Sequence, residues 1–227
     1  MKKIGIVSRE KSLIPEIKKK IKEYGFSFSV KPDFVLSMGG DGTFLVAERR
    51  YPGIPKILVK YNSICKKCAA FDIDHILQNI KDKNYKINEI EKLEASFNNK
   101  KLQAVNDIIV RNKQQYAALR FSLNVDSNNV GEFIGDGIVA STSFGSTGYF
   151  HSITRKSFNK GFAIAFNNIT EKRDPIFFNK KVEIKILREQ AIISADNNDN
   201  IITVSEGNTI IIYPKGKTKV MELHSAG

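Results

Sequence analysis

The sequence has little cysteine and no long apolar run. Two cysteines in 227 residues do not make a disulfide framework. No apolar stretch approaches the roughly 18 residues of a membrane span, and the opening residues, 1–7, enter directly into a strand-like pattern without a signal peptide. These absences argue against a disulfide-stabilised secreted scaffold and an integral membrane protein. We expect a cytoplasmic protein without a membrane partner.

Acidic residues are outnumbered: 36 Lys and Arg against 24 Asp and Glu give a net charge of +12. Such a charge attracts nucleic acid or smaller anions such as nucleotides. The lysines are scattered, however, with one local run at 18–22, and the chain is also rich in Asn and Ile, which indicates a compositional bias. We therefore expect nucleotides as partners and no nucleic acid.

Strands and helices alternate in the first third of the chain. The hydrophobic pattern predicts strands at 2–8, 34–38 and 56–59 and helices at 14–24, 43–50 and 72–80. Alternation with short links predicts a parallel, doubly wound α/β domain over residues 1–84, in which ligands gather at the carboxyl ends of the strands.

From about residue 85 the pattern becomes that of β-strands joined by polar turns. Strand-like runs occur at 85–97, 101–112, 116–125, 130–141, 181–187, 191–195, 200–204 and 209–213. This spacing predicts an all-β second domain over residues 85–213, a β-sandwich-like or curled antiparallel sheet. The segment Gly145–Asn168 interrupts the pattern with a glycine-rich turn. We expect two domains that share a cleft.

The most informative motif is the glycine turn at residues 38–46, which follows a short apolar run. Glycines 39, 40 and 42 allow positive φ angles and leave backbone N–H groups accessible to a bound anion. The turn is neither a P-loop, since no Gly-Lys-Ser/Thr follows, nor G-x-G-x-x-G, since Leu45 replaces the third glycine. A phosphate would repel Asp41, so this carboxylate either holds Mg²⁺ or takes a proton from an attacking hydroxyl. The alternative is a structural turn with Asp41 as a helix N-cap.

Three further motifs carry polar groups. Asp136 lies between two glycines ahead of a Ser/Thr-rich stretch in which Ser146 and Thr147 offer hydroxyls to a sugar or phosphate; the alternative is an ordinary polar loop. The pair Asn106-Asp107 opens an apolar strand and can bind a base edge and a ribose diol, or simply form a turn. Asp196 at a predicted hairpin is most simply an Asx-turn residue. No nucleophile elbow or His–acid pair indicates hydrolysis.

In this order the four motifs resemble those of the NAD kinase family, and the match covers nearly the whole chain. The glycine turn alone is shared with diacylglycerol and sphingosine kinases. Its combination with Gly135-Asp136-Gly137 and Gly145–Tyr149 is much more specific. The resemblance implies an α/β amino-terminal domain, a β-rich carboxyl-terminal domain, a tail (214–227) that returns to the first domain, and a homodimer or homotetramer.

The resemblance also implies transfer of a phosphoryl group from ATP or polyphosphate to the 2′-hydroxyl of the adenosine ribose of NAD. Mg²⁺ would arrive with the donor, with no fixed protein metal site. By position, Asp41 would be the proton acceptor and Gly42 would lie against the nucleotide. The other implied site residues are Gly39, Gly40 and Thr43 for the donor phosphates, Asn106 and Asp107 for adenosine, Asp136 for the nicotinamide half, Thr147, Gly148, Tyr149 and Ser152 for the adenine-ribose side, and Asp196 to close the pocket across a subunit boundary.

The chain departs from the family pattern at several positions. Val46 and Ile134 stand where the family usually has basic or polar residues, which leaves open a non-catalytic NAD(P)-binding protein. A lipid kinase is a further alternative, disfavoured by the Gly145–Tyr149 motif. A family glycine-rich loop is replaced by residues 61–67, where we expect Lys66 or Lys67 to restore a positive charge. The Cys65–Cys68 spacing lacks a second cysteine pair, so we expect two ordinary thiols.

Overall fold

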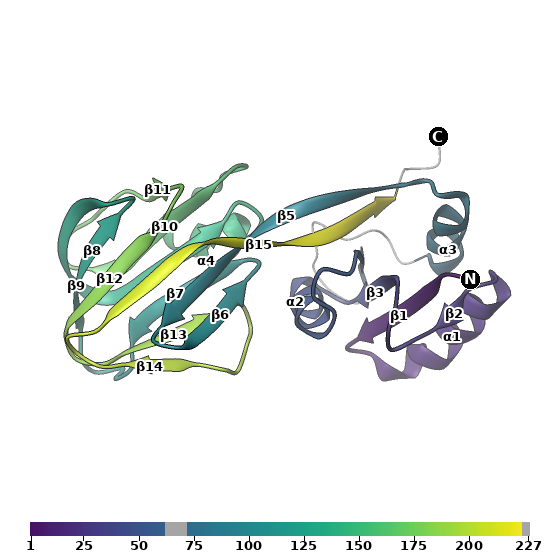
Figure 1. Ribbon diagram of the computed structural model, residues 1–227, viewed down its shortest axis with the longest axis horizontal. Helices are drawn as coiled ribbons and strands as arrows, with labels where there is room; N and C mark the ends of the chain where they lie inside the picture. Colours follow the sequence, from purple (N-terminus) through teal and green to yellow (C-terminus); the bar gives the residue numbers. More distant parts are fainter. Residues whose placement is uncertain (62–71, 224–227) are drawn as a thin grey trace. The chain divides into compact units, whose positions relative to one another are not determined.

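The computed structural model describes residues 1–61 and 72–223. Its internal contacts divide the chain into two units (Figure 1). Unit 1 comprises Met1–Ile90 together with the segment from Lys217, and unit 2 comprises Glu91–Gly216. Both boundaries fall inside long strands, β5 (Tyr85–Phe97) and β15 (Thr209–Leu223). They lie a few residues beyond the domain limits of 84 and 213 predicted from the sequence.

Unit 1 is a parallel sheet with helices. Its strands are ordered β15–β4–β3–β1–β2, and each neighbouring pair is parallel. The elements not yet bounded are β1 (Lys3–Ser8), the 3₁₀ turn η1 (Lys11–Leu13), α1 (Ile14–Glu23), β2 (Ser27–Phe28), β3 (Phe34–Met38), α2 (Asp41–Arg50), β4 (Lys56–Val59) and α3 (Ile73–Asp82). The predicted helix at 43–50 therefore begins two residues earlier, at Asp41.

Successive residues of β3 face opposite sides of this sheet, as the strand period of two requires. Leu36 packs in the core formed with α1 and α3, to which Ile17 and Ile76 contribute. Val35 packs on the other side, against Ala47 of α2. Helices therefore cover both faces of a parallel sheet, and the doubly wound α/β fold predicted from the sequence is confirmed.

Unit 2 is antiparallel and rich in strands. The order β14–β13–β7–β9–β8–β12–β15 runs through it, while β10 and β11 extend from the other edge of β9 and β6 pairs with β5. Its remaining elements are β6 (Lys100–Ala104), β7 (Asp107–Asn112), β8 (Leu119–Val125), β9 (Asn128–Thr142), η2 (Gly145–Thr147), α4 (Tyr149–Thr154), β10 (Phe162–Ile169), β11 (Ile176–Phe178), β12 (Val182–Arg188), β13 (Ala191–Ala195) and β14 (Ile202–Val204). The β-rich second domain is confirmed.

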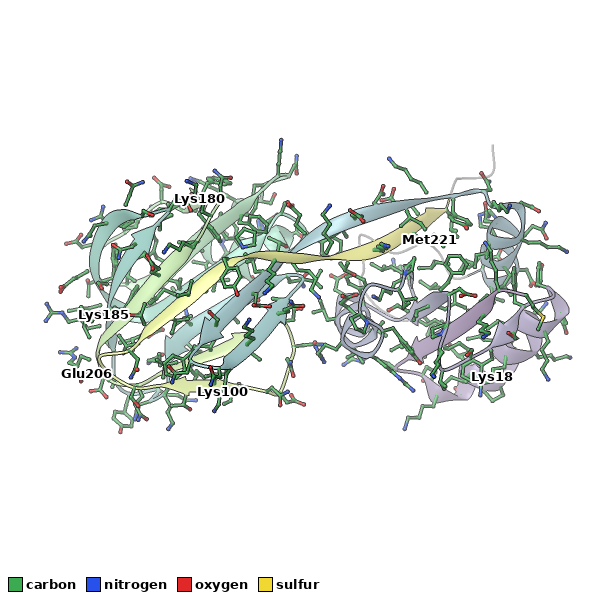
Figure 2. All side chains as sticks on the ribbon, in the orientation of Figure 1. Lys18, Lys100, Lys180, Lys185, Glu206 and Met221 are labelled. Atoms are coloured by element: carbon green, nitrogen blue, oxygen red, sulfur yellow. The ribbon has the colours of Figure 1, made fainter. Side chains whose placement is uncertain are left out.

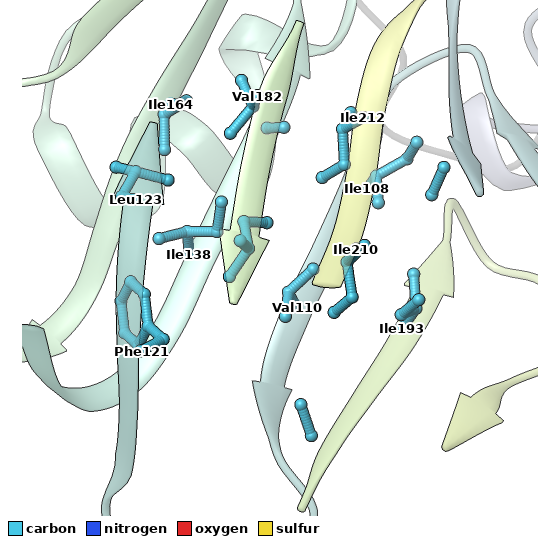
Figure 3. Close-up of a cluster of buried hydrophobic side chains, with 14 of the residues drawn as sticks. Ile108, Val110, Phe121, Leu123, Ile138, Ile164, Val182, Ile193, Ile210 and Ile212 are labelled. Carbon is cyan, nitrogen blue, oxygen red and sulfur yellow. The ribbon is translucent and has the colours of Figure 1, made fainter. Parts of the chain in front are cut away.

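The core of unit 2 lies between strands that turn alternate side chains inward. Figure 3 shows Phe121 and Leu123 of β8 meeting Ile138 of β9, and Ile210 of β15 lying near Val110 of β7. The opposite face of β9 and β10 is covered by α4. Many exposed lysines, such as the Lys180 and Lys185 labelled in Figure 2, point outward from this unit.

Two element predictions for this unit were wrong. The run 101–112 is not one strand, because β6 ends at Ala104 and β7 starts at Asp107. The segment Gly145–Asn168 is not merely irregular, because it contains η2, α4 and most of β10. β10 is buried on both sides: Ile164 faces the main core and Ala163 faces α4. A strand buried on both faces does not alternate apolar with polar residues, which hid it from the sequence pattern.

Candidate functional site

The glycine turn of unit 1 connects the end of β3 to the start of α2. Gly39 has φ +147°, and a Cβ at this position would lie 2.3 Å from Thr43 Oγ1. The Gly39 N–H donates to the Val59 carbonyl at 2.9 Å, which ties the turn to the end of β4. Only glycine fits both the backbone angle and the contact. Thr43 itself is buried beneath the turn.

Asp41 is the first residue of α2 and its side chain is exposed. Gly40 is the N-cap: the N–H groups of Thr43 and Phe44 donate to its carbonyl at 2.9 and 3.4 Å. The alternative prediction that Asp41 is the cap is therefore wrong. The start of a helix stabilises negative charge and favours anion binding. Asp41 thus combines an accessible carboxylate with an anion-attracting backbone.

The other end of α2 holds a buried ion pair that the sequence reading missed. Lys56 of β4 contacts Glu48, and both side chains are almost completely buried. Thr218 Oγ1 donates to Glu48 Oε2 at 2.6 Å, and Lys56 Nζ donates to the Tyr51 carbonyl at 2.7 Å. The sequence contained one signal for this ion pair, because Lys56 opens the apolar strand Lys56–Val59 and a fully buried lysine requires a partner.

In unit 2 the structure brings Asp196 to the start of β7. Asp196 Oδ1 accepts hydrogen bonds from the N–H groups of Asn106 (2.8 Å) and Asp107 (3.2 Å), and Oδ2 accepts one from Val105 (2.9 Å). The Asp196 N–H donates in return to the Asp107 carbonyl at 2.9 Å. The Asn106-Asp107 pair and Asp196, predicted as two separate motifs from the sequence, therefore form one local structure.

The turn after β9 packs on the same residues. Thr142 Oγ1 donates to the Val105 carbonyl at 2.6 Å and accepts from the Gly145 N–H at 3.0 Å. A Cβ on Gly145 would lie 2.3 Å from the Asn106 carbonyl oxygen, so glycine is required for this close approach. The hydroxyl-rich stretch is thus held against the Asn106-Asp107 pair.

Polar side-chain groups of this cluster lack protein partners. Asn106 Oδ1 is buried without a hydrogen-bond partner among the described residues. Asp107 is 7% exposed, and no hydrogen bond to its carboxylate occurs within residues 1–61 and 72–223. Burial, followed by the negative charge of Asp196, raises the pKa of the Asp107 carboxyl to about 7. Buried polar atoms normally have partners, so these indicate a ligand position.

The residues of the Gly145–Ser152 segment differ in accessibility. Thr147, Gly148 and Ser152 are exposed, and the Tyr149 hydroxyl accepts from Asn167 Nδ2 at 3.2 Å. Ser146 is buried, and its Oγ lies 2.8 Å from the Ser143 carbonyl oxygen and 2.9 Å from that of Phe158, either of which can accept its single proton. The expectation that the Ser146 hydroxyl binds a ligand was wrong, because this hydroxyl is hydrogen-bonded to backbone carbonyl groups of the protein.

Asp136 lies apart from this cluster. Asp107 pairs with Ser141 of β9. Ser141 lies five residues after Asp136 on the same strand, which corresponds to about 17 Å at 3.3 Å per residue. Asn168 Nδ2 donates to Asp136 Oδ2 at 3.2 Å. Asn168 also borders a hollow of about 550 Å³ whose lining includes Lys172 and Arg173. The two flanking glycines are structural, since a Cβ on either would contact a neighbouring strand within 2.4 Å.

Some sequence expectations lie outside the described residues: Lys66 and Lys67 as replacement charges, and the thiols of Cys65 and Cys68. In the part of the chain that the structure describes, no group of three or more His, Cys, Asp or Glu side chains is arranged to hold a metal ion. Over the same residues, no helix has the length and apolarity needed to span a membrane.

Solved structures share this combination of a parallel α/β unit, with its glycine-rich strand-to-helix turn, and an antiparallel unit. An Archaeoglobus fulgidus NAD kinase, solved in complex with ATP, superposes with a TM-score of 0.82 at 18% identity, covering 98% of this chain and 93% of that one. A yeast NADH kinase complexed with NADH gives a TM-score of 0.84 at 13% identity, covering 99% and 84%. At these identities the likeness establishes the fold.

Sequence comparison adds the family. The NAD kinase of Sulfurisphaera tokodaii is 30% identical over 191 residues, which are 79% of this chain and 71% of the relative. The chain belongs to the NAD kinase family. No family model matches it.

Other relatives match over shorter regions. The NAD kinases of Caldicellulosiruptor saccharolyticus and Petrotoga mobilis are 32% and 26% identical, over 53% and 52% of this chain. The chain spans about half the length of these relatives, 48% and 44%.

Proposed function

We propose that this protein is an NAD kinase, which transfers a phosphoryl group from ATP or polyphosphate to the 2′-hydroxyl of the adenosine ribose of NAD. The observation that carries the proposal is the exposed carboxylate of Asp41 at the first position of α2, directly after the glycine turn at Gly39 and Gly40. A carboxylate at an anion-attracting helix start suits deprotonation of a hydroxyl beside phosphates.

In the proposed reaction Asp41 takes the proton of the 2′-hydroxyl while the oxygen of that hydroxyl forms a bond to the terminal phosphorus of the donor. The bond between that phosphorus and the bridging oxygen breaks, and the leaving phosphate keeps the electron pair. A ribose hydroxyl has a high pKa, and a positioned base contributes about 10²–10⁴ in rate. The glycine turn, with Gly39, Gly40, Gly42 and Thr43, is proposed to lie against the donor and acceptor nucleotides.

The residues of the turn fit a divalent cation held mainly by the donor phosphates. Asp41 is an accessible carboxylate at the turn, and the described residues contain no multi-ligand metal cluster. Mg²⁺ typically binds through one or two carboxylates together with substrate phosphates and water. When bound, Mg²⁺ would neutralise charge that develops on the transferred phosphoryl group.

Unit 2 is proposed to bind the dinucleotide. The unpartnered Asn106 Oδ1 and the buried Asp107 carboxyl supply a donor and acceptors to adenosine. Thr147, Gly148, Tyr149 and Ser152 are proposed for the adenine-ribose side, because they follow the turn packed on Asn106. Asp136, with Asn168 and the basic hollow, is proposed for the nicotinamide half. A homo-oligomer and a cytoplasmic location also remain predictions.

The test is conversion of NAD to NADP by the purified full chain with ATP or polyphosphate and Mg²⁺, read by an NADP-specific dehydrogenase. Asp41→Asn is expected to lower kcat by about 10²–10⁴ while the dissociation constant for NAD changes less than about threefold. Asp72→Asn is the matched control. Asp72 is an exposed acid at the start of α3, where its side chain accepts the His75 N–H at 3.0 Å.

The outcomes separate the alternatives. Turnover that survives Asp41→Asn would remove Asp41 from the reaction. Tight NAD binding by the wild-type chain with no product from either donor would instead establish the non-catalytic NAD(P)-binding protein. Loss of turnover in Asp72→Asn as large as in Asp41→Asn would show that the effect is on folding.

A further inference from the structure

We propose that Asp196 is a positioning residue, whose carboxylate fixes the backbone of Val105–Asp107 so that Asn106 and Asp107 face the dinucleotide. This inference rests on the proposed function, and it changes the role expected for Asp196 from the sequence. Instead of closing the pocket by touching the ligand, Asp196 acts through the residues that it holds.

The contacts of Asp196 support a holding role. Both carboxylate oxygens accept backbone N–H groups of three consecutive residues, at 2.8 to 3.2 Å. The N–H groups of Val105 and Asn106 lie in the break between β6 and β7, and that of Asp107 opens β7. A carboxylate that accepts several N–H groups forms charge-assisted hydrogen bonds, which are about twice as strong as neutral ones.

The held segment is also contacted by the Ser/Thr-rich stretch that follows β9. Thr142 N donates to the Asn106 carbonyl at 2.9 Å, while Thr142 Oγ1 donates to the Val105 carbonyl. Asp196 therefore satisfies the N–H donors of the segment and the Asp107 carbonyl, while Thr142 satisfies the carbonyls of Val105 and Asn106. With the backbone fixed on both sides, the Asn106 and Asp107 side chains keep one direction before a ligand arrives. Binding then loses less conformational entropy.

The chain contains a matched control in Asp126. Its carboxylate also accepts N–H groups of three consecutive residues, Asn179, Lys180 and Lys181, at 2.8 to 2.9 Å. Asp126 and Asp196 have the same backbone conformation, with φ of 49° and 51°. Both belong to unit 2. Asp126 contacts none of the residues proposed to bind NAD.

The experiment compares Asp196→Asn with Asp126→Asn in the full chain. The melting temperature, the dissociation constant for NAD and the kcat and KM for NAD are measured for each. Both variants should lower the melting temperature. Only Asp196→Asn should raise the dissociation constant and KM for NAD, by about tenfold, with kcat within about threefold, because loss of one charge-assisted hydrogen bond is worth at least that factor.

Equal effects of the two variants on NAD affinity would overturn the positioning role, as would an Asp196→Asn protein that binds NAD like the wild type. If the wild-type chain itself neither binds nor phosphorylates NAD, the proposed function fails. Should Asp196→Asn not fold, hydrogen exchange of the wild-type chain decides. The amides of residues 105–107 should be protected although they lie in or beside the β6–β7 break, and rapid exchange would refute the contact.

Discussion

Replacing Lys56 by methionine should strongly destabilise unit 1. The substitution leaves Glu48, 4% exposed, without the cation that it contacts, and it leaves the Tyr51 carbonyl without its 2.7 Å donor. Removing one partner of a buried ion pair typically costs about 3–5 kcal/mol. At about 2–4 °C per kcal/mol for a chain of this size, the melting temperature should fall by about 6–20 °C.

A compensating variant tests the reason for this loss. Glu48→Leu, Lys56→Met and Thr218→Val together remove both charges and the hydroxyl from this site, and the Tyr51 carbonyl still lacks its donor. Buried ion pairs replaced by apolar groups are often neutral or stabilising. The triple variant should therefore recover most of the stability lost by Lys56→Met alone. Lys20→Met is the control, since Lys20 pairs with Asp74 at 2.9 Å but is 33% exposed, and it should lower the melting temperature much less than Lys56→Met.

The assay is thermal unfolding followed by circular dichroism in the far ultraviolet, in which most of the helical signal comes from α1–α3 of unit 1. Calorimetry tests whether the two units unfold in one transition. A loss below about 1 kcal/mol for Lys56→Met would contradict the view that the pair is buried and mutually dependent. A triple variant no more stable than Lys56→Met would show that shape, and not uncompensated charge, causes the loss.

Two other predictions concern unit 2. The raised pKa of Asp107 means that the folded chain keeps a proton which the unfolded chain releases near pH 4. This contribution to stability is complete below about pH 4 and is lost as the pH rises through about 7. The melting temperature of the wild-type chain should therefore contain a component that falls between these pH values, and the melting temperature of Asp107→Asn should lack this component. Gly137→Ala should prevent normal folding, since its Cβ would lie 2.0 Å from the Val110 carbonyl oxygen, whereas Gly131→Ala, with similar φ but open space, should cost only about 1–3 kcal/mol. Equal chemical denaturation midpoints for the two alanine variants would contradict the steric argument.

The sequence predicted the α/β unit well because its signals are local. Strand β3 is a short apolar run, α1 has apolar residues at helical spacing, and the glycines mark the turn between β3 and α2. Each of these depends on neighbours in the chain. The family resemblance implied that the tail 214–227 returns to the first domain, and the segment from Lys217 belongs to unit 1. The residue pattern did not reveal that β15 continues from Thr209 to Leu223, since Pro214 is typical of a strand end and the pairing of Val220 with Lys56 is long-range.

The candidate site was predicted as separate motifs, and their grouping came from the structure. Nothing local in the sequence shows that Asp196 reaches residues 105–107, which lie about 90 positions away. The same limit applies to Ser146, whose hydroxyl contacts the Phe158 carbonyl, and to Glu48, whose partners Lys56 and Thr218 lie on strands β4 and β15. Motif spacing identifies which chemical groups are present, whereas their partners depend on tertiary packing.

The course of β15 constrains the order in which the protein can be made. During translation the ribosome releases α2 and β4 long before residues 217–223, yet Thr218 and Met221 complete the interior of unit 1. Unit 2, in contrast, is one uninterrupted stretch of chain, Glu91–Gly216. The nascent α/β half must therefore wait, with an unfinished sheet edge beside β4, until the β-rich half has emerged, and this interval is when the chain most needs protection from aggregation.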